Sequence, residues 1–129
     1  MGSMENITYK FSNQSSKQKM NRAQRQDLKR MAVYLTELSH KEDVTLEELQ
    51  STASESAGEV EMMADEEQDK LDNMPENLAF SSRADDYQDN IDALYDIMSA
   101  LGDVEMSDTL EEARKDIASA VGMIYNLVD

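Results

Sequence analysis

The sequence predicts an all-α protein in which four amphipathic helices pack as a bundle, the last two forming an antiparallel hairpin. Apolar residues recur at three- and four-residue spacing along four stretches of the chain, which is the pattern of amphipathic helices. The composition favours helix over sheet, with one proline, four glycines and no tryptophan. The helix-start signal "TLEE" occurs twice, at residues 45–48 and 109–112.

Residues 1–18 are expected to form a flexible lead-in to one acidic helical domain at residues 19–129. The opening Met-Gly-Ser before a second Met is typical of an expression-tag remnant. The residues that follow are rich in Ser, Asn and Gln. In this part, apolar and polar residues alternate over one short stretch, which is compatible with a single strand. The apolar residues of this stretch are Ile7, Tyr9 and Phe11.

The first helix is expected from about Met20 to Ser39, with one apolar side. A second helix should begin after Thr45, whose hydroxyl can accept from the amide of Glu48 while the Glu48 side chain reaches back. It should end at Met74, because Pro75 disfavours helical geometry at the residue before it. The small residues at 54–58 suggest a bend or a close approach of two backbones.

The third helix is expected to be capped by Ser82 and terminated at Gly102. Its apolar seam follows a heptad spacing: Tyr87, Ile91, Leu94, Met98 and Leu101. The last helix should begin after Thr109. Because the link between these two helices is short, they should pack as an antiparallel hairpin.

The net charge of −16 is unevenly distributed along the chain. Residues 1–41 sum to +5 and residues 42–129 to −21. We therefore expect a partner with a basic surface and no direct binding of nucleic acid, although the basic residues near the N-terminus could contact phosphates by themselves. No run of about 18 apolar residues and no signal-peptide pattern is present, so we expect a cytoplasmic protein without membrane association.

The acidic residues of the third helix form a stripe. At 100° per residue, four aspartates fall on the side opposite the apolar seam: Asp85, Asp89, Asp92 and Asp96. The stripe predicts either a basic partner or an internal contact with the basic flank of the first helix, formed by Arg22, Arg25 and Lys29. A plain solvated face is the simpler alternative.

The second helix carries further candidate partner-binding residues. Asp65, Asp69 and Asp72 should point outward, and Met62 should also lie on the outer face. Glu67 falls on the apolar side, so its charge should be paired, at the rim, or facing a partner. Lys70, three residues later, is the local candidate for pairing.

Catalytic motifs are scarce. His40 is the only histidine and is expected near a helix C-terminus, and no P-loop, dinucleotide fingerprint or EF-hand spacing is present. We therefore predict a non-enzymatic protein with no cofactor and no metal. A minor alternative is a metal-dependent nucleotide pyrophosphohydrolase, because the pairs Glu66/Asp69 and Asp89/Asp92 have a spacing that resembles those all-α enzymes.

Residues 59–101 resemble a segment of small uncharacterised proteins of Gram-positive phages and mobile elements. In that segment an acidic helix runs into a "DN-hydrophobic-PENL" turn, followed by Ser, Arg and a second helix. The matching residues here are Asp72, Asn73, Met74, Pro75, Glu76, Asn77, Leu78, Ser82 and Arg83. The resemblance implies an origin in a phage or mobile element. It does not indicate a biochemical activity.

That origin, the small size and the acidity lead to a functional hypothesis. We expect a protein that blocks a host nucleic-acid-processing defence enzyme, with Cas9 as the first candidate, by a DNA-mimicking acidic surface, as some anti-CRISPR proteins do. The alternative is a helical structural or assembly protein that acts through self-association. The sequence leaves a homo-oligomer open.

Overall fold

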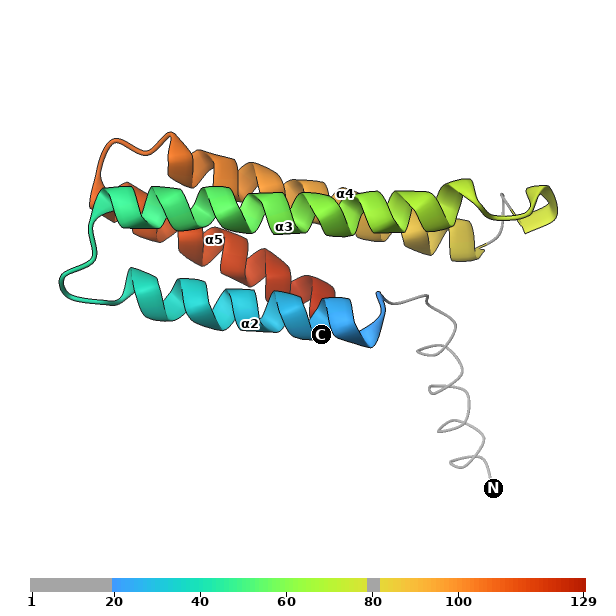
Figure 1. Cartoon of the computed structure of the whole chain (residues 1–129), viewed down its shortest axis with the longest axis horizontal. Coiled ribbons are helices and arrows are strands. Elements are labelled where there is room, and N and C mark those ends of the chain that lie inside the picture. Colours follow the sequence, from blue (N-terminus) through green and yellow to red (C-terminus); the bar gives the residue numbers. More distant parts are fainter. Residues whose placement is uncertain (1–19, 79–81) are drawn as a thin grey trace, which may run out of the picture.

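The computed structural model describes residues 20–78 and 82–129, which form four α-helices and one short 3-10 helix (Figure 1). Their bounds are α2 Arg22–Ser39, α3 Leu46–Asp72, η1 Glu76–Leu78, α4 Ser82–Glu105 and α5 Leu110–Val128. The predicted all-α fold is confirmed. The expected flexible lead-in and the strand of Ile7, Tyr9 and Phe11 lie outside the described residues.

The helices are arranged around one core, but their contacts are unequal. The antiparallel pair α3 and α4 makes the most extensive contact, followed by the hairpin of α4 and α5 and then by α2 with α5. The contact between α2 and α3 is sparse. The α3–α4 hairpin also extends beyond the ends of α2 and α5 (Figure 1). One seam of the bundle is therefore more open than the others.

The apolar sides predicted from the sequence meet in this core. Each helix buries residues at three- and four-residue spacing. This spacing places them on one side of the helix, and burial of that apolar side brings amphipathic helices together. The largest fully buried apolar side chains are Leu28, Leu35, Leu49, Val60, Ile91, Leu94, Ile97, Leu101, Val104, Ile117 and Ile124. Burying a side chain of this size contributes about 1.5–3 kcal/mol, so this layer supplies much of the stability of the fold.

The two "TLEE" segments start helices as predicted. The backbone N–H of Glu48 donates to Thr45 Oγ1 at 3.1 Å, and the Thr45 hydroxyl donates to Glu48 Oε1 at 3.2 Å. At the second segment the backbone N–H of Glu112 donates to Thr109 Oγ1 at 3.1 Å. Each threonine therefore satisfies one of the backbone donors that a helix start leaves unpaired.

Several predicted boundaries are corrected by the structure. α4 continues past Gly102 to Glu105, because Val104 is fully buried and this packing outweighs the helix-ending tendency of glycine. Ser82 is the first helical residue rather than the cap. α3 ends at Asp72, two residues before Met74, and runs unbroken through residues 54–58. An added Cβ at Gly58 would meet no atom within 4 Å, so there is no close backbone approach there.

Two side chains satisfy carbonyl groups at the ends of helices that are distant in sequence. Gln50 Nε2 donates to the carbonyls of Val104, Glu105 and Ser107 at 3.4, 3.2 and 2.9 Å. Arg114 Nε donates to the carbonyl of Ser39 at 2.8 Å. Helix C-termini expose unpaired carbonyls, so these bonds fix the ends of α4 and α2 against α3 and α5.

Replacing Gly58 and Gly122 together by Ala is expected to raise the free energy of unfolding by about 1–2 kcal/mol. Both glycines are exposed within helices, and an added Cβ meets nothing within 4 Å at either position. Urea denaturation followed by circular dichroism measures the change. The reverse substitution at an exposed α5 position, Ala118→Gly, should lower stability by about 0.5–1 kcal/mol. A loss of stability in the double alanine variant would contradict the expectation.

Candidate partner-binding site

The four aspartates of α4 form an exposed row on the outer face of the bundle. Asp85, Asp89, Asp92 and Asp96 are all exposed, whereas Ile91, Leu94 and Ile97 on the other side of the helix are buried. The helical rotation of 100° per residue explains this division. The row runs over 12 residues, and the 11 helical steps between its ends cover about 16 Å of helix axis. We call these four residues the α4 aspartate row.

No cation neutralises this row within the described part of the chain. Ion pairs found there join Arg30 to Asp27 at 3.1 Å and Lys70 to Glu67 at 2.9 Å, and neither includes an aspartate of the row. Within the row, Asp92 accepts a hydrogen bond from the neutral Gln88 side chain at 3.0 Å. Like charges at these spacings repel by a few tenths of a kcal/mol per pair. Among the described residues, no ion pair therefore relieves the negative charge of this row.

A second group of exposed aspartates lies on the adjoining helix α3. Asp65, Asp69 and Asp72 are exposed, as the sequence predicted. Gln68 Nε2 donates to Asp72 Oδ1 at 2.9 Å, again a neutral donor. Since α3 and α4 share the most extensive contact of any two helices, both acidic groups belong to one helical hairpin.

Glu67 does not belong to this exposed surface. Its side chain is fully buried, and its Oε1 accepts a bond from Lys70 Nζ at 2.9 Å. The predicted pairing with Lys70 is thus present, but a buried carboxylate cannot contact a partner on the surface of the free protein. The helical position explains this, because Glu67 follows Val60 and Ala64 along the side of α3 that faces the core.

The basic flank of α2 does not cover the α4 aspartate row. α2 packs mainly against α5, and all four aspartates remain exposed. Arg22 and Lys29 are exposed, and Arg25 Nε donates to the carbonyl of Met20 at 3.1 Å. The alternative in which the basic flank of α2 neutralises the row is therefore not what the structure shows.

The two acidic pairs that suggested a nucleotide pyrophosphohydrolase lie on the surfaces of two different helices. Glu66 and Asp69 are exposed on α3, and Asp89 and Asp92 are exposed on α4. The described residues contain no group of three or more His, Asp or Glu side chains placed to hold a metal ion. His40 caps α2 as predicted, with Nδ1 2.8 Å from the carbonyl of Thr36.

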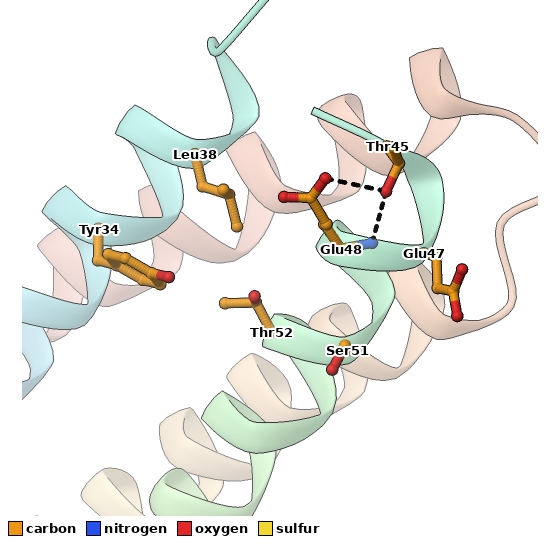
Figure 2. A pocket seen from close by; sticks show the side chains of 7 residues that line it. All are labelled: Tyr34, Leu38, Thr45, Glu47, Glu48, Ser51 and Thr52. Atoms are coloured by element: carbon orange, nitrogen blue, oxygen red, sulfur yellow. Dashed lines mark hydrogen bonds between the residues drawn. The ribbon is translucent and has the colours of Figure 1, made fainter. Parts of the chain in front are cut away.

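A hollow between α2 and α3 was not predicted from the sequence as a site. Tyr34 and Leu38 of α2 face Ser51 and Thr52 of α3 across it, and the capping pair of Thr45 and Glu48 closes one end (Figure 2). The sequence predicted one feature of this region, the exposure of Met62 further along α3, and Met62 is exposed. The hollow itself depends on the sparse α2–α3 contact, which no sequence pattern shows.

Comparisons of the chain with protein-family models, with curated proteins and with solved structures found no match. Among the helices that the structure describes, none combines the length and the apolar character needed to cross a bilayer.

Proposed function

We propose that this protein is a non-enzymatic inhibitor from a phage or mobile element that binds a host nucleic-acid-processing defence enzyme in the bacterial cytoplasm. The observation that carries the proposal is the α4 aspartate row, which is exposed over about 16 Å and has no cationic partner among the described residues. A basic channel that normally holds a nucleic-acid backbone has the complementary charge.

The spacing of the row supports mimicry of a nucleic-acid strand. Its neighbouring charges are separated by about 4.5 to 6 Å along the helix axis, and a DNA strand presents about one phosphate per 3.4 Å. The row is fixed on a helix whose opposite side is packed in the core, so binding requires little ordering of the backbone. Cas9 is the first candidate, because it holds nucleic acid in a positively charged channel.

The first experiment is DNA cleavage by a Cas9 of a Gram-positive bacterium with equimolar protein. The protein is added before guide loading, after guide loading, or after DNA. We expect inhibition only when the protein precedes DNA, because the two compete for one basic site. The absence of inhibition in every order would exclude this Cas9 as the target.

Changing all four aspartates of the α4 row to asparagine should raise the inhibitory concentration at least about 100-fold, which corresponds to about 0.7 kcal/mol per charge. The matched control removes four exposed carboxylates elsewhere through Glu37→Gln, Glu42→Gln, Asp43→Asn and Asp108→Asn. The control should lose less than about fivefold through the general change in charge. Equal losses in the two variants would show that net charge, and not the row, is responsible.

The alternative of a structural or assembly protein makes a different prediction. Six large apolar side chains are exposed in the described residues: Val33, Tyr34, Met62, Tyr95, Met106 and Tyr125. Self-association through them would give an oligomer whose size rises with concentration in light scattering and does not depend on the α4 aspartate row. A monomer at all concentrations would exclude this alternative.

A further inference from the structure

A groove runs along the open seam between α2 and α3. It consists of three adjoining hollows of about 370, 320 and 370 Å³. Tyr34 and Thr52 line both the first and the second hollow, and Asp27 and Glu59 line both the second and the third. From Leu38 to Gln24 the groove follows about 21 Å of α2. We call it the α2–α3 groove.

Part of the groove is apolar. Tyr34 and Met62 are 57% and 67% exposed, Leu38 is half-buried, and Met31 and Met63 are almost fully buried beneath the groove. Exposed apolar side chains surrounded by polar groups mark protein-interaction sites. Methionine adapts to different partner shapes because it is unbranched and polarisable. Tyr34 points across the hollow toward Thr52 rather than into the core (Figure 2).

The sides of the groove are acidic. Six carboxylate side chains line the three hollows: Asp27, Glu47, Glu48, Glu55, Glu59 and Glu66. The one cation lining them is Arg30, whose Nη1 is bound to Asp27 at 3.1 Å. A cationic ligand is therefore complementary to the groove.

Gln24 supplies an independent observation. It lines the hollow near the start of α2 and is 5% exposed, yet neither its amide nitrogen nor its amide oxygen has a hydrogen-bond partner in the described structure. A buried amide without partners is unfavourable, and most such groups in folded proteins are paired. A turn of the Gln24 side chain toward the hollow that it lines would let a polar side chain in the groove satisfy it.

We propose that the α2–α3 groove binds a cationic amphipathic helix of a partner protein. About 14 residues of helix match the length of the groove, and apolar residues at i, i+3, i+4 and i+7 would contact the side chains around Tyr34 and Met62. Lysines or arginines on the flanks would face the carboxylates, and one amide side chain would reach Gln24. The groove shares no residue with the α4 aspartate row, so this proposal does not depend on the proposed function.

The test uses a fluorescein-labelled synthetic helix of 18 residues, with leucines and one asparagine on one face and lysines on the other. Anisotropy is measured at 0.5 M salt, where screening acts within roughly 4 Å and suppresses non-specific attraction. We expect saturable binding with a Kd of about 10 µM or tighter. The absence of saturation when the protein is titrated to about 1 mM would overturn the proposal.

Matched variants locate the site. Tyr34→Ala with Met62→Ala should weaken binding at least about tenfold, because both side chains contact the apolar face of the probe. Tyr95→Ala with Tyr125→Ala removes two exposed aromatic side chains outside the groove and should change the Kd less than about twofold. Similar effects of both pairs would overturn the assignment. A separate control is the variant in which all four aspartates of the α4 aspartate row are changed to asparagine. This variant should still bind the probe.

The role of Gln24 is tested by a double-mutant cycle. Replacing the asparagine of the probe by leucine should weaken binding to the native chain at least about threefold, and should not weaken binding to the Gln24→Leu variant. Equal effects on both chains would show that no amide contact forms with Gln24. The cycle compares differences, so a uniform change in the stability of the variant does not affect it.

Two other occupants give different results. The basic N-terminal residues of the chain itself are one other possible occupant of the groove. In that case, changing Lys10, Lys17 and Lys19 to Glu in the full chain would release this segment from the groove and strengthen probe binding at least about tenfold. If a second copy occupied it, light scattering would detect a dimer that Tyr34→Ala with Met62→Ala abolishes. Either result would overturn the proposal of a separate partner.

Discussion

Leu94→Ala is expected to lower the free energy of unfolding by about 3 kcal/mol, within a range of about 2–5 kcal/mol. Leu94 is fully buried in α4, the helix that packs on both α3 and α5, so the truncation removes apolar contacts and leaves a cavity. Denaturation in urea, followed at 222 nm by circular dichroism, measures the loss. A domain with a stability of about 5–15 kcal/mol should remain folded without denaturant.

The neighbouring residue provides the control for the orientation of α4. Tyr95 is 50% exposed, so Tyr95→Ala should cost less than about 1 kcal/mol. If Tyr95→Ala cost as much as Leu94→Ala, α4 would have to be rotated relative to the core. The α4 aspartate row would then not face outward. The pair of variants therefore tests the burial on which the proposed function depends.

Lys70→Met is expected to lower the free energy of unfolding by about 2 kcal/mol. The substitution keeps an aliphatic side chain but leaves the fully buried Glu67 carboxylate without its cation. Because the side chain of Lys70 is 36% exposed, solvent screens the pair, and the loss should be below the 3–5 kcal/mol typical of fully buried pairs.

The opposite substitution, Glu67→Met, should change stability by less than about 1 kcal/mol or increase it. It removes the buried charge, including the Oε2 atom that has no hydrogen-bond partner in the described structure, and Lys70 can then turn to solvent. Thermal and urea denaturation of both variants give the comparison. A larger loss in Glu67→Met than in Lys70→Met would show that the carboxylate makes a favourable contact beyond the ion pair.

The sequence predicted the parts of the fold that depend on local chemistry. Thr45 and Thr109 start helices because their hydroxyls accept from the amide three residues later. The helical period placed Leu94 inside and Asp92 outside. These features follow from positions three or four residues apart, which a single sequence shows directly.

Other features depend on contacts that a single sequence does not reveal. The continuation of α4 past Gly102 depends on the burial of Val104 by neighbouring helices. The bonds of Gln50 and Arg114 to distant helix ends depend on how the helices are arranged. For the same reason the position of α2, and with it the α2–α3 groove, was not predicted. The exposure of the aspartates was predicted, whereas their partner is still a proposal.

The unequal contacts of α2 have a consequence for folding during synthesis. The chain makes α2 first of the described helices, but its main packing partner is α5, which begins 71 residues after Ser39. At about 5–20 residues per second, the ribosome needs roughly 4 to 14 s to reach α5. Helices α3 and α4 can pair during this interval, because they are adjacent in sequence and make the most extensive contact. We therefore expect much of the apolar side of α2 to stay unburied in the nascent chain until α5 is made.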